Sequence, residues 1–475
     1  MKRIEHPRVE DRQASGKAAR KQTPPSGHSG WAPARGRPDP VALLEEQNAT
    51  REPDLVPVRH GRMMVSPFTF YRGAAKIMAS DLADTPTAGL DVQLCGDAHL
   101  SNFGVFASPE RELVFDLNDF DETLPGPFEY DVKRMAASFT IAARNNGFTK
   151  AQGQTATSMS VRAYREAMAQ FAEMRTLDIW YAKMSEQELL GALDAAAGSQ
   201  KGADKKAATA AHKNARKNAK KAHTRDSLQA LSKLAEHVGG RYRIVSQPPV
   251  VVPLRELPAI HGYSVEELER MVHSQFREYR ATLQDERREL LERFEVVDMA
   301  RKVVGVGSVG TRAFIVLLQG RDQDDPLFLQ VKEATKSVLE DRLPKSQYEQ
   351  PGERVVQGQR RMQAASDIFL GWAKGSEADR HMYWRQLRDM KGSAVVEAMA
   401  PATLAFYARA CGDTLARAHA RSGDPVALAA YLGSKDRFDE SITDFAERYA
   451  DQNDQDFRAF CDAVTSGRLE AVQDV

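Results

Sequence analysis

The chain has 475 residues, of which 66 are Lys or Arg and 66 are Asp or Glu, so its formal net charge at pH 7 is zero. That balance provides no overall attraction to nucleic acid or to an anionic membrane surface, and we expect neither as a partner. No apolar run reaches the roughly 18 residues of a transmembrane helix, and the N-terminus lacks the apolar core of a secretory signal. Three widely spaced cysteines form no disulfide or metal-ligand pattern, which favours a reducing cytoplasm.

The N-terminal part of the chain changes character after about forty residues. Residues 1–45 are rich in Lys, Arg, Gly, Pro and Ser, a composition that predicts a disordered basic arm. A helix is expected to begin near Ser66. Arg59, Arg62 and Arg72 lie on this segment and are candidates to pair with phosphate or with the acidic loop that follows. Ordinary salt bridges are the simpler interpretation of any one of them.

The most informative part of the chain is a pair of neighbouring segments, LCGDAHLSNFGVF over 94–106 and ELVFDLNDFDET over 112–123. Apolar residues interleave with the acids, so we expect the acids at strand ends rather than in a solvated turn. A carboxylate, a following amide and further carboxylates after a hairpin suit phosphoryl transfer. The polar side chains that these segments supply are Asp97, His99, Asn102, Asp116, Asp119 and Asp121.

In phosphoryl transfer, one acid accepts the proton of the attacking hydroxyl, while an amide and a carboxylate hold Mg²⁺ on the nucleotide phosphates. We assign the first role to Asp97 and the second to Asn102 and Asp119. Asp121 is expected to assist them or to hold a second ion. An ordinary pKa would suffice for Asp97, because positioning and charge stabilisation contribute more than proton removal.

A glycine-rich loop occurs much later, between two β-rich runs in ARKVVGVGSVGTRAFIVLL over 300–318. Glycines allow backbone N–H groups to approach phosphates closely, although a plain hairpin turn also explains them. Lys332 follows on an alternating strand and resembles the lysine of the third kinase strand, which implies pairing with the phosphates; the alternative is a surface strand residue. Glu353 is the candidate carboxylate to anchor that lysine, with Glu349 as the other choice. The expected phosphate-cradling residues are Gly305, Gly307, Ser308 and Gly310.

The remaining periodicities are mainly helical. Asp131 lies near the start of an expected helix over 128–145, where it either orients the acidic loop through backbone hydrogen bonds or caps the helix. The segment 201–225 is rich in Ala and Lys, and we interpret it as a solvated basic insertion rather than a nucleic-acid site. Further helices are expected over 152–197, 265–294, 353–371 and 404–419, with a strand over 381–390.

GDAHLSN resembles the catalytic loop of the aminoglycoside and choline phosphotransferase branch of the protein-kinase-like superfamily, which reads H-G-D-x-H-x-x-N. The resemblance implies that Asp97 is the catalytic Asp, that His99 is the second His, and that Asn102 binds metal. Asp119, within NDFD, matches the metal-binding Asp. Cys95 stands where the motif has its first His, so the contribution of that His is in doubt. The implied ligands are ATP and Mg²⁺.

Kinase-like proteins place the glycine loop and lysine before the catalytic loop, whereas this chain places them after it. The resemblance therefore implies an α+β, two-lobe, protein-kinase-like fold in circularly permuted order. The alternative is a fortuitous glycine loop, with a small lobe built from residues 55–95. The expected parts are the arm over 1–45, a helical large lobe over 46–290, a small β-rich nucleotide-binding lobe over 291–395, and helices over 396–475 that complete the large lobe.

The wider pattern, from SPFTFYRGAA through GDAHLSNFG, LQVKEA and CGDTLARAHARSGD, resembles the uncharacterised bacterial family DUF2252. The function we expect is ATP- and Mg²⁺-dependent phosphoryl transfer to a hydroxyl acceptor, either a small molecule or a protein. The alternatives are a kinase-fold AMP-transferase and a non-catalytic nucleotide-binding regulator. A metal-dependent phosphoesterase is disfavoured, because the sequence contains no Gly-Asn-His.

Overall fold

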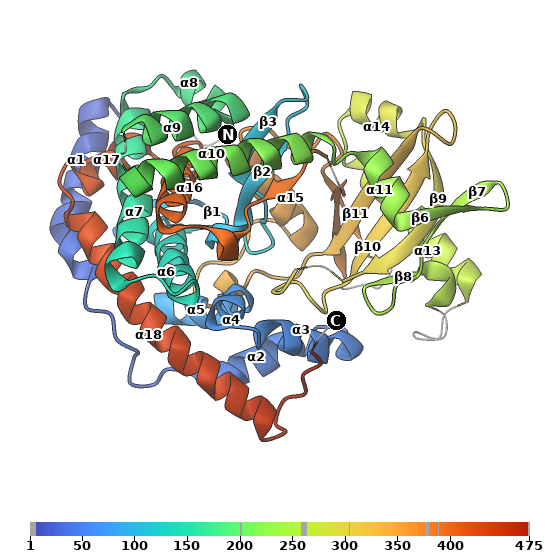
Figure 1. The fold of residues 1–475 in the computed structure, drawn as a ribbon, viewed down its shortest axis with the longest axis horizontal. Coiled ribbons are helices and arrows are strands. Elements are labelled where there is room, and N and C mark those ends of the chain that lie inside the picture. Colours follow the sequence, from blue (N-terminus) through green and yellow to red (C-terminus); the bar gives the residue numbers. More distant parts are fainter. Residues whose placement is uncertain are drawn as a thin grey trace.

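The computed structural model describes residues 6–473 except 200–201, 258–263, 304, 376–379 and 388. The fold is α+β, as expected, with a helical part and a part built on one large sheet (Figure 1). Among the described residues, no helix has the length and apolar character needed to cross a membrane.

Helices from both ends of the chain build the helical part. The long helix α16 (Pro401–Ala420) packs along α7 (Lys150–Glu173), and α6 (Glu129–Asn145) lies against both. These helices and α18 (Arg437–Thr465) enclose the main apolar core. The predicted helices over 128–145 and 404–419 are thereby confirmed. The other helices of this part are α1 (Val9–Gln22), α2 (Pro40–Asn48), α3 (Val56–Met63), α4 (Pro67–Gly73), α5 (Ala75–Leu82), α8 (Thr176–Tyr181), α9 (Glu186–Ser199), α10 (Gly202–His223) and α17 (Pro425–Leu432).

The large sheet has six antiparallel strands in the order β12-β13-β11-β10-β9-β8. Lys332 pairs with Ala313 on one side and with Tyr383 on the other, which fixes its place in the middle of the sheet. The predicted strand over 381–390 is confirmed as β13. The bounds are β8 (Val251–Pro253), β9 (Glu295–Lys302), β10 (Ala313–Gln319), β11 (Pro326–Glu333), β12 (Gly371–Lys374) and β13 (His381–Gln386).

Two groups of helices cover the two faces of this sheet. Tyr279 of α13 (Val265–Ala281) stacks on Trp384 with ring centroids 4.7 Å apart, and α11 (Ser227–Leu234) buries its apolar side on the other face. The expected helix over 265–294 is divided into α13 and α14 (Asp285–Leu291) by a break over 282–284. Apolar side chains of both helices are buried against the strands of this sheet.

Two small sheets carry the acidic segments between the helical part and the large sheet. β2 (Phe103–Ala107) and β3 (Leu113–Leu117) form a hairpin within the order β14-β2-β3-β5, with β5 (Met184–Ser185) and β14 (Gly392–Ser393) at its edges. β1 (Asp91–Leu94) pairs with β4 (Leu124–Pro127). The two sheets hold the loops 95–102 and 118–123 close together. A further pair, β6 (Ala235–Val238) and β7 (Arg241–Ile244), lies apart from them.

The N-terminal segment is not the disordered arm that its composition predicts. Helix α1 packs on α17, where a side chain at Gly16 would come within 2.1 Å of a carbonyl oxygen. The Arg12 guanidinium donates to Asp424 at 2.8 Å. Arg37 pairs at 2.6 Å with both Asp81 and Asp456, so ion pairs with distant helices order this basic segment.

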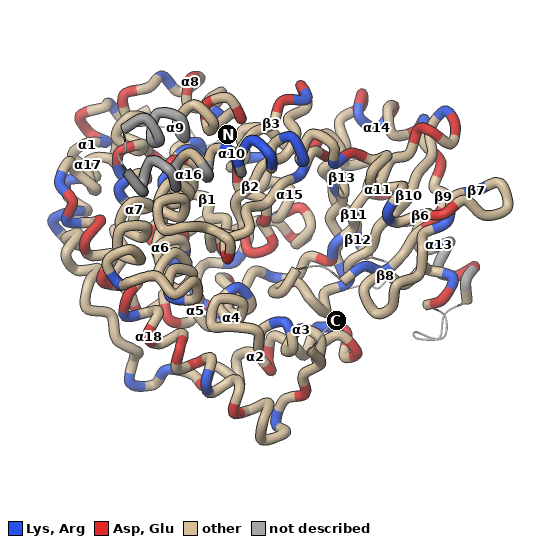
Figure 2. Tube along the Cα trace, viewed as in Figure 1, with Lys and Arg blue, Asp and Glu red and all other residues tan. Residues whose placement is uncertain are grey.

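The basic insertion over 201–225 forms the helix α10. The described Lys and Arg side chains of α10 point to solvent, as expected. Figure 2 shows that Lys, Arg, Asp and Glu are spread over the elements around this helix. Ala219 and Ala222 are buried against Ala107, Leu113 and Met390. Small residues thus pack this helix against the β2–β3 hairpin. Its polar composition did not predict this contact.

Two expected helices are shorter than predicted, and one start site is confirmed. The segment 152–197 is divided into α7, α8 and α9 by a turn and by the short strand β5. Helix α15 (Pro351–Met362) ends nine residues before Gly371, and its C-terminal side leads into a loop. α15 contacts β12 and β13 on one side and α16 and β1 on the other.

Ser66 caps α4, as its sequence position predicts.

Candidate functional site

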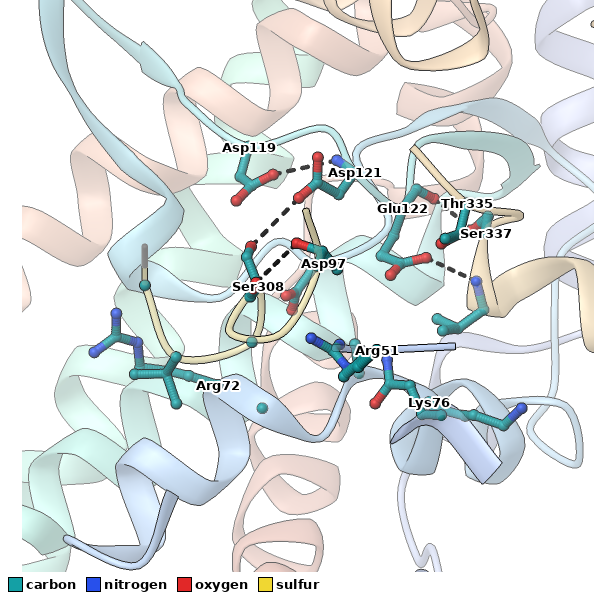
Figure 3. Close-up of a pocket in the computed structure, with 18 of the residues that line it drawn as sticks. Arg51, Arg72, Lys76, Asp97, Asp119, Asp121, Glu122, Ser308, Thr335 and Ser337 are labelled. Carbon is teal, nitrogen blue, oxygen red and sulfur yellow. Dashed lines mark hydrogen bonds between the residues drawn. The ribbon is translucent and has the colours of Figure 1, made fainter. Parts of the chain in front are cut away.

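A cavity of about 450 Å³ lies where the acidic loops, the glycine loop and the segment 46–76 meet (Figure 3). The predicted residues that line it are Asp97, His99, Asn102, Asp119, Asp121, Gly305, Gly307 and Ser308. Gly310, Lys332 and Glu353 lie outside this lining. The cavity therefore collects side chains from segments that are some 200 residues apart in the sequence.

Asp131 orients the first acidic loop. Its carboxylate accepts hydrogen bonds from the backbone N–H groups of Cys95 at 2.7 Å and Gly96 at 3.0 Å. His419 of α16 lies 3.2 Å from the same carboxylate. Gly96 has a φ of +85°, and a Cβ there would lie 2.2 Å from a carbonyl oxygen, so only glycine fits. Of the two roles considered for Asp131, the structure confirms the orientation of the loop.

Asp97 lies in the cavity wall beside Arg134, whose Nε donates to its carboxylate at 2.8 Å. Burial raises the pKa of Asp97 to about 6, although the guanidinium of Arg134 works in the opposite direction. His99 Nε2 is 3.8 Å from the other oxygen of Asp97. Burial and the nearby charge of Arg72 keep the pKa of His99 well below its usual range, so this imidazole is neutral.

Asn102 and Asp119 are held by the backbone around them. Asn102 donates its amide N–H to the carbonyl of Asp97 at 2.7 Å, which leaves its amide oxygen for another partner. One oxygen of Asp119 accepts the backbone N–H of Asp121 at 3.2 Å. Both side chains line the cavity, so each presents an oxygen to whatever binds there.

Lys332 lies near the end of β11, behind the cavity lining, and pairs with the lining residue Asp121 at 2.5 Å. Burial disfavours its charge, but the carboxylates of Asp119 and Asp121 outweigh burial and raise the pKa of Lys332. Asp121 also accepts hydrogen bonds from the hydroxyl groups of Tyr383 at 2.6 Å and Ser308 at 3.4 Å. The sheet, the acidic loop and the glycine loop thus meet at one carboxylate.

The prediction that Glu353 or Glu349 anchors Lys332 is wrong, because Asp121 occupies that position. Glu349 is exposed in the loop before α15. Successive residues of a helix point about 100° apart, and here Arg354 rather than Glu353 faces the acidic loop. The Arg354 guanidinium donates to the carbonyls of Thr123 at 2.6 Å and Asp121 at 2.7 Å.

The glycine loop is held by the segment that precedes the acidic loop. Arg62 donates to the carbonyl of Gly305 at 2.7 Å, and the backbone N–H of Glu52 donates to Gly310 at 2.8 Å. Arg51 donates to the carbonyl of Val309. Gly310 has a φ of +87°, which explains why it is a glycine although it does not line the cavity.

Other residues of the site were not found from the sequence. Arg51 and Lys76 line the cavity, as does Glu122, and burial raises the pKa of Glu122 to about 7. Arg134 carried a recognisable signal, because it lies three residues after Asp131 on one helix and therefore on a similar face. Arg59, by contrast, is buried and donates to Asn48, Gln47 and Gly73, which makes it a structural residue.

Within the part of the chain that the structure describes, no three His, Cys, Asp or Glu side chains are arranged to enclose a metal ion. A Mg²⁺ site needs fewer protein side chains, since the ion commonly takes one or two protein oxygens together with water and substrate phosphates. The free oxygens of Asn102 and Asp119 at the cavity wall fit that demand. They suit an ion that completes its coordination with water and another ligand rather than one held by protein oxygens alone.

Residues 51–463 match the family DUF2252, described as an uncharacterized protein conserved in bacteria. Because the match covers most of the chain, this protein belongs to that family. No curated protein and no solved structure matches it.

Proposed function

We propose that the protein is an ATP- and Mg²⁺-dependent phosphotransferase that acts on a hydroxyl acceptor. The observation that carries this proposal is the ion pair between Lys332 and Asp121, which joins the glycine-loop sheet to the acidic loop across 211 residues of sequence. The same cavity holds a carboxylate beside an amide, Asp97 with Asn102. These are the groups that phosphoryl transfer requires, and we propose that they correspond to those of kinase-like proteins in permuted chain order.

Each group has a role that its surroundings support. Asp97 is the base for the acceptor hydroxyl, because with a pKa of about 6 it is mostly ionised at neutral pH. Arg134 holds that carboxylate in place. Asn102 and Asp119 would hold Mg²⁺, which neutralises phosphate charge when it is bound. Neighbouring carboxylates keep Lys332 charged, and it would pair with phosphate oxygens by exchanging its bond to Asp121 for them.

The proposal is tested by calorimetric titration of ATP with and without Mg²⁺ on the wild type, Asp119→Ala and Lys332→Met. Wild type should bind ATP with Mg²⁺, Asp119→Ala should lose the Mg²⁺ dependence, and Lys332→Met should bind more weakly. Asp324→Ala, which removes an exposed carboxylate from a turn of the same sheet, is the matched control and should bind as wild type does. Absence of nucleotide binding by the wild type would refute the proposal.

The transferred group is identified by the mass of the product. A phosphate and an AMP add different increments to an acceptor, so a screen of hydroxyl compounds and proteins with ATP separates the phosphotransferase from the AMP-transferase alternative. ATP binding without turnover on any acceptor or water would favour the nucleotide-binding regulator instead.

A further inference from the structure

A second, smaller cavity of about 60 Å³ lies between the β2–β3 hairpin, helix α15 and the end of β13. Asn118 lines this small cavity, and the next residue, Asp119, lines the large one. Its volume is too small for a nucleoside, but it suits a group the size of one phosphate. Its lining consists of Phe106, Ala107, Asn118, Gln359, Gln363, Asp367, Arg385, Gln386, Leu387, Asp389 and Lys391.

Some nitrogen donors in the cavity lining have no hydrogen-bond acceptor among the described residues. Arg385 donates from Nε to Gln330 at 3.0 Å and from Nη1 to the carbonyl of Asn118 at 3.1 Å, which leaves the outer edge of its guanidinium unused. Nδ2 of Asn118 is buried and has no hydrogen-bond partner among the described residues. In the same part of the structure, the ammonium of Lys391 has neither a hydrogen bond nor an ion pair.

Both carboxylates in the lining have partners of their own, although Asp367 also favours the charged forms of Arg385 and Lys391. Asp367 accepts the backbone N–H groups of Phe369, at 2.8 Å, and of Gln386. Asp389 pairs with the Arg111 guanidinium. Burial and the positive charge of Arg385 lower the pKa of Lys391 to about 7, as expected for a cation without a partner. Buried donors without acceptors are costly, and a bound anion would satisfy them.

We propose that this cavity is a binding site for one phosphate-type oxyanion, held by Lys391, Arg385 and the side-chain amide of Asn118. The three residues line one small cavity from different parts of the chain, and bonds to an ionised acceptor are stronger than neutral ones. The oxyanion is either free inorganic phosphate or the terminal phosphate of a nucleotide whose remainder lies in the large cavity. Binding of inorganic phosphate requires no nucleotide, so this proposal and the phosphotransferase proposal can fail separately.

The first experiment is a calorimetric titration of inorganic phosphate into wild type, Lys391→Met and Arg385→Gln. Sodium chloride keeps the ionic strength constant, because weak surface binding is screened by salt. Each variant should bind phosphate about tenfold to a hundredfold more weakly than wild type, the range expected for losing a hydrogen bond to a charged group. Lys374→Met, which removes an exposed lysine at the end of β12, is the matched control and should bind normally.

Thermal unfolding in phosphate separates lost binding from lost folding. Phosphate should raise the Tm of wild type and of Lys374→Met, because a ligand of the native state stabilises it, and should raise the Tm of Lys391→Met much less. A variant that still unfolds cooperatively in phosphate-free buffer is folded, so its loss of binding is then informative. No saturable binding by wild type up to roughly 10 mM, or equal binding by wild type and both variants, would overturn the proposal.

The source of the oxyanion follows from competition with ATP. If the site takes the terminal phosphate of a nucleotide, ATP should displace inorganic phosphate, and Lys391→Met should weaken ATP binding more than AMP binding. If the site takes free phosphate, both ligands should bind together, and Lys391→Met should leave ATP affinity unchanged. Either result supports the site and identifies its ligand.

Discussion

The acidic loop over 95–123 and the glycine loop over 305–310 face the same cavity, but they are held in different ways. The acidic loop is fixed by buried side chains of α6 and α16, among them Asp131, Arg134 and Arg417. The glycine loop is fixed by contacts from residues 51–62, of which those of Arg51 and Glu52 are buried and that of Arg62 is exposed. Buried charge pairs impose a single geometry, whereas exposed bonds compete with water.

This contrast separates the carboxylate proposed to act in the reaction from the loop proposed to bind the nucleotide. The carboxylate of Asp97 is preorganised whether or not a ligand is present, as catalysis by positioned groups requires. The glycine loop depends on a segment outside its own hairpin, so its position can respond to what that segment does. Loops with few buried contacts open at the lowest free-energy cost. Substitutions in the two loops should therefore have effects of different kinds and sizes.

The largest effect is expected from Asp97→Asn, which removes the proposed base but keeps an oxygen for Arg134 to bind. Turnover of ATP should fall by about a hundredfold to ten-thousandfold, the usual contribution of general base catalysis. ATP affinity should be nearly unchanged, because the substitution leaves the glycine loop and Lys332 intact. Steady-state turnover and calorimetry measure the two quantities. Equal losses of both would refute the role assigned to Asp97.

The next largest effect is expected from Arg417→Met. It leaves the buried carboxylate of Asp116 without its guanidinium partner, which should lower the free energy of unfolding by about 3–5 kcal/mol. Arg409→Met on the exposed side of the same helix, where the ion pair with Asp413 is 3.9 Å long, should cost about 1 kcal/mol or less. Denaturant unfolding measures both. Similar losses in the two variants would mean that the acidic loop is not held by buried charge.

In the glycine loop we expect a smaller effect on stability from Gly310→Ala. The left-handed φ of +87° and the contact with Arg51 should together cost about 1–2 kcal/mol. ATP binding should weaken as well, since the loop must shift to accommodate the methyl group. Gly36→Ala, at an open position where no atom lies within 4 Å, should change stability by less than about 0.5 kcal/mol. Unchanged ATP affinity in Gly310→Ala would show that the loop does not contact the nucleotide.

The pH dependence of the acidic loop should separate activity from stability. Because Asp97 must be ionised to act, kcat/KM should rise about tenfold per pH unit below 6 and level off above it. In the folded protein the pKa of Asp97 is raised from 3.8 to about 6, so the folded state binds this proton more tightly than the unfolded chain does. The resulting stabilisation is present below about pH 4 and is lost as the pH rises to 6.

Activity and this part of the stability should therefore change in opposite directions between pH 4 and 6. The check is a comparison of unfolding free energies of wild type and Asp97→Asn across that range, since the variant lacks the titrating group. Identical pH dependence of the two proteins would show that Asp97 has an ordinary pKa.

The smallest effect is expected from Arg62→Gln, which removes the bond to the carbonyl of Gly305. A partly exposed bond of this kind should contribute about 0.5 kcal/mol to stability. Its loss should nevertheless change nucleotide affinity more than Arg409→Met does, because it acts on the glycine loop. Hydrogen exchange of residues 305–310 would report the loosened loop directly. A stability loss as large as that of Arg417→Met would contradict the contrast between the two loops.

Much of the cavity could be predicted because its groups lie in short motifs. Asp97, Asn102 and Asp119 each follow an apolar strand, and the pattern of strand and loop places them together without knowledge of distant contacts. Asp131 was recognisable for the same reason, since it begins the next helix. Ser308 followed from the glycine spacing.

The partners of these groups could not be predicted, because they come from far along the chain or from a helix face that the sequence leaves ambiguous. Glu353 and Arg354 are neighbours in sequence, and only the packing of α15 decides which of them faces the acidic loop. The prediction of a disordered N-terminal arm was wrong for a similar reason. Its composition is that of a disordered chain, and the acids that order it, such as Asp424, are supplied more than 400 residues later.

The position of α16 near the end of the chain has a consequence for synthesis. Arg417 and His419 emerge from the ribosome 301 and 288 residues after the carboxylates of Asp116 and Asp131 that they bind. At about 5–20 residues per second, that interval lasts about 15–60 seconds. Throughout it the carboxylates of Asp116 and Asp131 lack these partners, so the nascent chain cannot complete the support of the acidic loop. An interrupted translation product would therefore lack part of its buried charge pairing and should be a target for proteases.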